Sequence, residues 1–351
     1  MAAMNMEEKK VRIGVLSYAH AHQQTWCKVF TSRPDACVTA VWDDDEARGR
    51  RQAEALGVEY HRDVEQLLRR SDVDAVTICA ENAKHAALAV AAAEHGKHIM
   101  MQKPMATSVA EAERIVAAVK KNGVKYMQAH NLRFDPIHTT IKKLVEEGRI
   151  GKVSMIRRRH SHHFAIDPGE RERVLGWMTD PAQSGGGALM DEGAHAILWF
   201  LWMCGRPHSV TARMSTVTSG LMVEDNAMLL FDFPGGSIGC LQTSWTETAG
   251  DATIEIFGDR GVIIASGTDI ASSRALPDLP RPLRLYNTDK GSWEYPEVEL
   301  VKSRPTPPAN AFIDYLKSEG PSPIDVDTAA LAIKIAMSAY ESAQTGRTIT
   351  I

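Results

Sequence analysis

The sequence predicts an α/β protein of two domains, in which a doubly wound parallel sheet is followed by an α+β domain with a large, mostly antiparallel open sheet. Residues 1–130 alternate short apolar runs with segments of helical period, which is typical of a parallel sheet covered by helices. Later segments have period two, which is typical of antiparallel strands with one polar face. A chain of 351 residues also exceeds the size that one hydrophobic core usually reaches.

The expected strands of the first domain are the apolar runs at residues 11–16, 38–42, 75–79, 98–101 and 125–129. The expected helices lie at residues 23–30, 46–56, 64–69, 83–94 and 109–122. Gly57, Gly96 and Gly123 each follow a helical segment, where a residue that adopts positive φ ends a helix. Strands and helices are therefore expected to alternate through residues 1–130.

The second domain is expected to span residues 131–351 and to begin with a linking helix that ends near Gly148. Its expected strands are residues 153–159, 209–215, 226–233, 237–244, 252–257, 262–265 and 348–351. Its expected helices are residues 194–204, 309–318 and 328–346. The helical segment 309–320 is a candidate to pack back on the first domain.

The composition excludes several partners. Forty basic and 44 acidic side chains give a formal charge of −4, without the basic surplus of a nucleic-acid-binding domain. The most apolar run, residues 193–205, is shorter than the roughly 20 residues that cross a bilayer. The five cysteines form no Cys-x-x-Cys pair and the N-terminus lacks an apolar signal segment. We therefore expect a cytoplasmic protein with reduced thiols and no membrane or nucleic-acid partner.

The turn after the first strand is the expected cofactor site, because doubly wound sheets bind dinucleotides there on a Gly-x-Gly-x-x-Gly sequence. Residues 17–22 keep the spacing but read Ser-Tyr-Ala-His-Ala-His. Ser17 and Ala19 are small enough for backbone contacts, whereas His22 would push the helix away or point outward. His20 could meet phosphate oxygens at the helix start. The candidate cofactor contacts in this turn are Ser17, Tyr18, Ala19 and His20.

Asp43 directly follows the second strand, where an acid can accept both hydroxyls of an adenosine ribose. A carboxylate there would repel a 2′-phosphate, so the predicted cofactor is NAD. One alternative is that Asp43, Asp44 and Asp45 form only a polar loop. The other is that Arg48 accommodates NADP.

Two motifs together resemble the Gfo/Idh/MocA family of glucose-fructose oxidoreductases and inositol dehydrogenases. The first is Gln102-Lys103-Pro104 after the run 98–101, and the second is the sequence Gly-Gly-Gly-Ala-Leu-Met-Asp-Glu-Gly-Ala-His at residues 185–195. The resemblance covers nearly the whole chain and includes Asn82, His85 and the Asn-x-Arg-Phe-x-Pro sequence at residues 131–136. Gln102 departs from the usual Glu-Lys-Pro triplet, as the lost glycines depart from the usual turn.

The resemblance implies a Rossmann domain that binds NAD(P) and a C-terminal sheet that binds a sugar, polyol or related compound. It implies further cofactor contacts from Glu81, Asn82, His85, Gln102 and Lys103. It also implies the catalytic set of Lys103, Asp191 and His195. The family needs no metal.

The chemistry of this set can be argued from the residues. Oxidation of a secondary alcohol needs a base near the hydroxyl, and imidazole has a pKa near working pH. If residues 194–204 are helical, Asp191 and His195 share a face, where the carboxylate can orient the imidazole or touch the substrate. Lys103 can hold the developing alkoxide, and its bond to Pro104 is a candidate for the cis form. The preceding glycines would let the backbone approach a ligand. The alternatives are a buried core histidine at 195 and a solvated lysine at 103.

The segment 157–163, Arg-Arg-Arg-His-Ser-His-His, is a candidate substrate edge. Alternation places residues 157, 159 and 161 on one face and residues 158, 160 and 162 on the other. Arginine binds carboxylate or phosphate in two-point fashion, which suggests an anionic sugar. The alternative is a solvated edge, expected chiefly for Arg157 and Arg158. The candidate substrate contacts are Arg159, His162, His163, Trp177, Asp191 and His195.

A metal bound by His160, His162 and His163 is a weaker interpretation, because no cysteine or spaced carboxylate completes a coordination sphere in the sequence. The leading function is therefore NAD-dependent oxidation of a sugar or polyol, without a metal. One alternative is an NAD-dependent glycoside hydrolase that oxidises, eliminates, hydrates and reduces its substrate. Another is a non-catalytic NAD(P)-binding sensor. A homo-oligomer, as a dimer or tetramer, is expected because an antiparallel sheet can leave one face free to pair.

Overall fold

The structure is a computed structural model that describes residues 10–248, 254–266, 283–298 and 308–351. These residues divide into two compact units. The first unit contains residues 10–105, 110–129 and 308–327, and the second contains the rest. Helix α10 (Pro308–Lys317) therefore belongs to the first unit, although it lies late in the sequence.

The first unit contains a six-stranded parallel sheet in the order β3-β2-β1-β4-β5-β6. Its strands are β1 (Val11–Leu16), β2 (Ala36–Trp42), β3 (Glu59–His61), β4 (Ala75–Ile78), β5 (His98–Met101) and β6 (Tyr126–Gln128). The order reverses between β1 and β4, the place where doubly wound sheets bind dinucleotides. The predicted Rossmann fold is confirmed, and only the three-residue strand β3 was not predicted.

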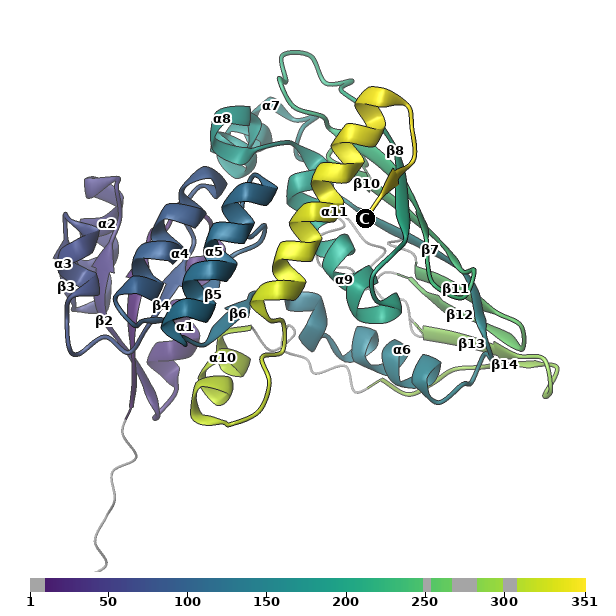
Figure 1. Ribbon diagram of the computed structural model, residues 1–351, viewed down its shortest axis with the longest axis horizontal. Coiled ribbons are helices and arrows are strands. Elements are labelled where there is room, and N and C mark those ends of the chain that lie inside the picture. Colours follow the sequence, from purple (N-terminus) through teal and green to yellow (C-terminus); the bar gives the residue numbers. More distant parts are fainter. Residues whose placement is uncertain (1–9, 249–253, 267–282, 299–307) are drawn as a thin grey trace, which may run out of the picture. The chain divides into compact units, whose positions relative to one another are not determined.

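Helices flank this sheet (Figure 1). They are α1 (His22–Ser32), α2 (Glu46–Leu56), α3 (Val64–Leu68), η1 (Asn82–Lys84), α4 (His85–Glu94) and α5 (Val109–Asn122). Asp45 caps α2 by accepting the Arg48 amide, and Gly57 ends it with φ 67°. Phe312 and Ile313 of α10 join the core cluster that contains Trp26 and Phe30 of α1. The late helix thus completes the core of the first unit.

Among the described residues, the second unit contains a nine-stranded sheet in the order β14-β13-β12-β11-β7-β10-β9-β8-β15. Its strands are β7 (Val153–Ser161), β8 (Ser209–Ser215), β9 (Asn226–Asp232), β10 (Ile238–Ser244), β11 (Ile254–Gly258), β12 (Gly261–Ala265), β13 (Leu283–Asn287), β14 (Ser292–Glu294) and β15 (Ile349–Thr350). Neighbouring strands are antiparallel except β7 and β10, which are parallel. The predicted mostly antiparallel sheet is confirmed, with β13 and β14 as unpredicted additions.

The long helices of the second unit lie on one face of this sheet (Figure 1). They are α6 (Pro136–Glu146), α9 (Ala194–Cys204) and α11 (Val326–Thr345). Phe200 of α9 packs on the rings of Phe231 and Phe233, and Ser342 of α11 accepts the Ala212 amide of β8. We call this the inner face of the sheet and the opposite one the outer face. The shorter elements are η2 (Asn131–Phe134), α7 (Pro168–Glu170), η3 (Arg171–Leu175), η4 (Gly176–Thr179), α8 (Pro181–Ser184) and η5 (Leu189–Gly193).

Two further expectations can be compared with the described part of the chain. No helix there combines the length and the apolar character that crossing a membrane requires. None of the five cysteines forms a disulfide.

Candidate functional site

The turn after β1 has a residue with positive φ although glycines are absent from it. Ser17 has φ 71°, in the left-handed region where glycine is common and other residues are rare. The Ser17 hydroxyl accepts the Ala19 amide at 3.1 Å, and the Ser17 amide donates to the Trp42 carbonyl at 2.8 Å. The Tyr18 ring is buried beside Cys27. The turn lies at the carboxyl ends of β1 and β4, where doubly wound sheets bind dinucleotides, and the amides of Ser17 and Ala19 are engaged within the protein.

Asp43 fastens this turn to helix α2. Its carboxylate is fully buried and accepts from Arg48 Nε at 2.8 Å, from Arg48 Nη2 at 2.6 Å and from the Tyr18 amide at 2.8 Å. These donors bind the two Asp43 oxygens that were predicted to accept the ribose hydroxyls. The more exposed charges at this edge are Asp44 and Lys84, and Lys84 contacts both Asp44 and Glu81. Burial alone would raise the pKa of Asp44, but the hydrogen bond and charge of Lys84 lower it.

Gln102 bridges the two histidines of the turn. Its Nε2 lies 3.1 Å from both His20 Nε2 and His22 Nδ1. His20 Nδ1 accepts the His22 amide, so the neutral His20 ring carries its proton on Nε2. That proton needs an acceptor. The oxygen and nitrogen of the Gln102 amide can be exchanged in position, and with its oxygen toward His20 the amide accepts this proton. The His22 ring turns toward Gln102, so the expectation that it points outward is wrong, whereas the expected displacement of the helix stays a prediction.

His85 and Lys103 hold the loop that follows β5. The ring nitrogens of His85 lie 2.8 Å from the Pro104 carbonyl and 3.0 Å from the Ala80 carbonyl. The His85 side chain is fully buried, and burial lowers its pKa. The Lys103–Pro104 bond is cis, as expected, and Lys103 is buried, so the solvated alternative is wrong. Glu81 and Asn82 are buried at the start of η1, and their roles at the cofactor stay predictions.

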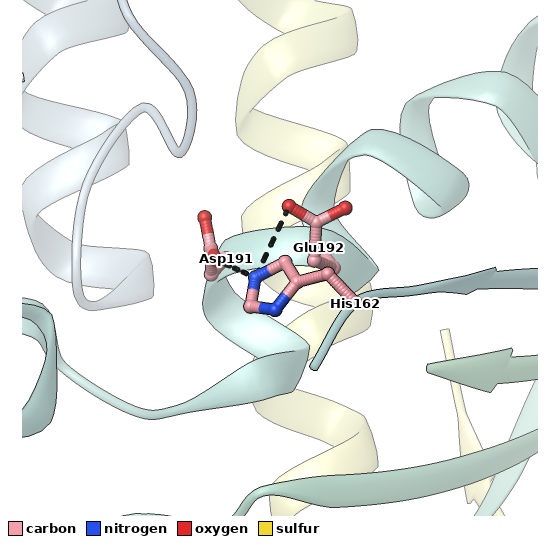
Figure 2. Close-up of side chains that lie close together, drawn as sticks. All are labelled: His162, Asp191 and Glu192. Atoms are coloured by element: carbon pink, nitrogen blue, oxygen red, sulfur yellow. Dashed lines mark ion pairs between the residues drawn. The ribbon is translucent and has the colours of Figure 1, made fainter. Parts of the chain in front are cut away.

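Two acids and several histidines gather at the start of α9 in the second unit. The wide π-helical turn η5 carries Asp191 and Glu192, which we call the acid pair. Strand β7 and the residue after it bring two histidines to the same place. Glu192 Oε2 lies 2.8 Å from His160 Nε2. Asp191 Oδ2 lies 3.5 Å from His162 Nε2, and Figure 2 shows these two side chains together with Glu192. The His195 ring lies 5.5 Å from the ring of His160.

The sequence argued against a metal because no carboxylate stands near the three histidines, and the folded structure shows that this reason is wrong. The sequence offered no carboxylate beside His160, His162 and His163. The fold supplies two, because ligand atoms of His162, Asp191 and Glu192 lie within 4.8 Å of one another. Whether these atoms suit a metal depends on where the histidine protons lie.

Trp245 holds Asp191 and was missed by the sequence analysis. Its Nε1 donates to Asp191 Oδ2 at 3.0 Å, and its ring stacks on His162 with an interplanar angle of 9°. Trp245 is fully buried in an apolar cluster that includes Leu175 and Val223. The only signal in the sequence is a tryptophan directly after an expected strand, and this pattern is typical of a core residue.

Strand β7 separates its three arginines. Arg158 was expected to be solvated, and this is wrong: it is 2% exposed, its guanidinium lies 4.7 Å over the Trp199 ring, and Nη2 lies 3.3 Å from His160 Nδ1. Arg157 and Arg159 lie on the outer face. Arg159 Nε pairs with Glu247 at 2.9 Å, and Arg157 Nη1 pairs with Glu255 at 3.2 Å. The inner face is therefore the one beside the acid pair.

Three of the candidate substrate contacts stay predictions: His163, Trp177 and Arg159. His163 is half-buried, with its ring 5.1 Å from the Phe164 ring. Trp177 lies half-buried in η4. Arg159 also stays a prediction, with Glu247 as its partner in this structure.

The glycine run before η5 packs closely against its own unit, and the ligand approach expected from the sequence stays a prediction. A Cβ on Gly187 would lie 1.9 Å from the Glu224 carbonyl oxygen, and one on Gly186 would lie 2.0 Å from Tyr340 Oη. The Glu224 carboxylate accepts the Gly187 and Leu189 amides, each at 3.0 Å, and the Tyr340 hydroxyl at 2.7 Å. Burial raises the pKa of Glu224 despite these hydrogen bonds. Glu224 and Tyr340, both unpredicted, therefore fix the start of η5.

Gly187→Ala is expected to lower the free energy of unfolding by about 2 kcal/mol, because the added Cβ overlaps a backbone oxygen that cannot rotate away. Denaturant unfolding followed by circular dichroism measures this. Gly169→Ala is the matched control, because its Cβ would meet only the exposed Asp167 carboxylate at 3.3 Å. Equal unfolding midpoints for the two variants would contradict the packing role.

Comparison with known proteins decides the family. A family model described as an oxidoreductase family with an NAD-binding Rossmann fold matches residues 11–130. A second model, the GFO/IDH/MocA C-terminal domain, matches residues 138–264. The chain belongs to the Gfo/Idh/MocA oxidoreductase family. The resemblance read from the sequence is thereby confirmed, and the first unit is the NAD-binding domain of a Gfo/Idh/MocA protein.

Relatives within the Gfo/Idh/MocA family include polyol and anhydrosugar dehydrogenases. The chain is 27% identical to the myo-inositol 2-dehydrogenase of Thermotoga maritima over 325 residues, which cover 90% of this chain and 92% of that protein. It is 30% identical to the levoglucosan dehydrogenase of Pseudarthrobacter phenanthrenivorans over 218 residues, 55% of each chain. The crystal structure of an oxidoreductase domain protein from Kribbella flavida has a TM-score of 0.82 at 26% identity, covering 98% of this chain and 99% of that one.

The lowered pKa values of two buried histidines lead us to expect that the free energy of unfolding of this Gfo/Idh/MocA protein depends on pH. Burial lowers the pKa of His85, and burial together with the charge of Arg158 lowers that of His130 well below its usual range. Below about pH 6.5 the unfolded chain therefore binds more protons than the folded chain. The free energy of unfolding is expected to fall as the pH drops, by up to about 1.4 kcal/mol per pH unit for each such proton.

Urea unfolding between about pH 7.5 and about pH 5.5 measures this slope. His130→Gln removes one of the two groups and is expected to flatten it. An unchanged slope in His130→Gln would show that His130 is not a neutral buried group.

Proposed function

We propose that this protein is an NAD-dependent dehydrogenase that oxidises a secondary hydroxyl of a sugar or polyol. The observation that carries the proposal is the gathering of Asp191, His160 and His195 at the start of α9, in a chain whose family is an NAD-binding oxidoreductase family. Polyol and anhydrosugar dehydrogenases among its relatives support the substrate class. NAD, when bound, accepts the hydride from the substrate carbon.

The roles within the chain follow from the chemistry of each side chain. His195, mostly buried at the start of α9, takes the hydroxyl proton. Asp191, held through Oδ2 by Trp245, accepts a hydrogen bond from a substrate hydroxyl and orients the His195 imidazole. Lys103 holds the developing alkoxide by its charge and hydrogen bonds. At the cofactor, the small side chains of Ser17 and Ala19 leave room for the pyrophosphate beside the turn.

A panel of monosaccharides and inositols tests the proposal, with NADH formation measured for each at saturating NAD⁺ and again with NADP⁺. At least one neutral sugar or polyol is expected to reduce NAD⁺. Lys103→Ala is expected to abolish that turnover while NADH binding remains. Turnover near the wild-type level in Lys103→Ala would refute the role of Lys103.

Two alternatives are separated by the same assay. The glycoside hydrolase alternative rested on Gln102 and on the cationic end of β7. Gln102 is engaged with His20 and His22, and the outer arginines pair with carboxylates. We therefore place the dehydrogenase first. Aglycone release without accumulated NADH would favour the hydrolase, and NADH binding without turnover of any sugar or glycoside would favour a sensor.

We also propose that the protein forms a homodimer through the outer face of the nine-stranded sheet. Met155, Met228, Leu230 and Ile238 are 42–54% exposed on the adjacent strands β7, β9 and β10. A second copy that presents the same face would bury them around a two-fold axis. Light scattering after size exclusion is expected to give a dimer or a larger even assembly. Leu230→Glu is expected to reduce it to a monomer, whereas Met222→Glu, at an exposed residue outside the strands, is expected not to. A monomeric wild type would contradict the proposal.

A further inference from the structure

The proton of His160 is placed by its neighbours. Arg158 Nη2 lies 3.3 Å from His160 Nδ1, and a guanidinium can only donate. His160 Nδ1 is therefore the acceptor, and the proton of the neutral ring lies on Nε2. His160 Nε2 is 2.8 Å from Glu192 Oε2, so the protonated edge of the ring faces this carboxylate without a hydrogen bond of good geometry.

The proton of His162 is placed in the same way. The Phe164 amide donates to His162 Nδ1 at 3.2 Å, which leaves the ring proton on Nε2. His162 Nε2 faces Asp191 Oδ2 at 3.5 Å and Glu192 Oε1 at 3.8 Å (Figure 2). The Trp245 N–H donates to Asp191, and the N–H edges of the two histidine rings face the acid pair.

A metal would need the opposite proton placement. His162 could bind a metal through Nε2 only with its proton on Nδ1, the atom that accepts the Phe164 amide. The group of His162, Asp191 and Glu192 is therefore arranged as a set of donors and acceptors. The carboxylates remain the acceptors for a ligand.

The balance of charge at the acid pair is negative. Arg158 is the arginine on the inner face of β7, and its guanidinium lies over Trp199 and against His160. Arg157 and Arg159 lie on the outer face and pair with Glu255 and Glu247. The sequence suggested that these arginines bind an anionic sugar at two points. In the structure, Arg157 and Arg159 pair instead with carboxylates of the protein itself.

We propose that the acid pair makes this a site for a neutral or amine-bearing sugar or polyol and makes Glu192 a specificity residue that rejects anionic sugars. Substrate hydroxyls donate to carboxylates, and an ammonium group adds an opposite charge. A carboxylate on the substrate would instead add a third negative charge beside Asp191 and Glu192. The inference rests on the proposed function in one respect, since it takes Asp191 as a substrate contact.

Three sugars that differ mainly in charge test this inference: D-glucose, D-glucosamine and D-glucuronate. Their binding to the full chain with NAD⁺ present is ranked by saturation-transfer NMR, and turnover is recorded in parallel. Glucuronate is expected to bind about tenfold more weakly than glucose or worse, the size of one repulsive charge contact near a surface. Glu192→Gln is expected to raise the binding of glucuronate relative to glucose. Glu255→Gln, which removes an equal charge on the outer face, is expected to leave the ranking unchanged.

The outcomes separate this inference from the proposed function. If the ranking holds but none of the three sugars reduces NAD⁺, the charge inference stands and the dehydrogenase proposal fails for these substrates. Preferred binding of glucuronate, or a ranking that Glu192→Gln does not move, would overturn the inference whatever the turnover.

The placement of the ring protons has its own test, which needs no sugar. Side-chain ¹⁵N NMR of the labelled protein, assigned with His160→Gln and His162→Gln, is expected to show Nε2–H in both rings. A proton on Nδ1 of either ring would overturn the inference. Stoichiometric binding of Zn²⁺ alone that displaces the Nε2 proton, and that is lost in His162→Gln, would also overturn it.

Discussion

Replacing His195 with alanine is expected to lower kcat by about 100-fold to 10,000-fold, the range for loss of a positioned general base. The imidazole is mostly buried, and its ring lies 5.5 Å from the rings of both His130 and His160. Bulk water is therefore not expected to take over as the base when the imidazole is removed. Binding of NADH, followed by fluorescence, is expected to stay near the wild-type value. The reason is that the first unit alone builds the dinucleotide turn.

Two measurements separate this role from a structural one. Added imidazole is expected to restore part of the turnover of His195→Ala, because the small molecule can occupy the vacated space and accept the proton. His208→Ala, which removes an exposed histidine of the same unit, is expected to leave kcat unchanged. A His195→Ala variant with wild-type kcat, or one that has lost NADH affinity without losing kcat, would refute the assignment.

The fold was largely predictable because buried parallel strands appear in the sequence as short apolar runs. The expected run at residues 11–16 and the expected helix at residues 109–122 match β1 and α5 residue for residue. Strand β3 has three residues, of which only His61 is buried, so it carries no comparable pattern. Helix η5 was also missed, since one π turn has no periodicity of its own to detect.

The site was predictable only where its residues belong to motifs. Asp191 and His195 stand out in a short motif, whereas Trp245 and Glu224 reach the site through strand pairing and loop packing that the sequence does not display. Alternation predicted correctly that Arg158 and Arg159 face opposite ways. It could not show which face is inner, and the preference of arginine for solvent suggested the wrong answer for Arg158.

Asp43→Ala is expected to lower the free energy of unfolding by about 3 kcal/mol and to weaken the binding of NAD. Removing the carboxylate leaves the half-buried Arg48 guanidinium without its two-point partner and leaves the Tyr18 amide without its acceptor. The left-handed conformation of Ser17 would lose the anchor that keeps the turn in place. Denaturant unfolding and NADH titration measure the two effects in the same variant.

The two measurements together decide between the role that the sequence suggested and the role that the structure indicates. A carboxylate that only binds ribose hydroxyls would weaken NAD binding on removal and leave unfolding unchanged. A carboxylate that fastens the turn to α2 must change both, because the turn predicted to bind the cofactor is also part of the fold. Asp43→Asn keeps one acceptor oxygen and is expected to lie between the wild type and Asp43→Ala in both measurements. Asp44→Asn removes the neighbouring, 38% exposed carboxylate and is expected to leave the unfolding free energy within about 0.5 kcal/mol of the wild type.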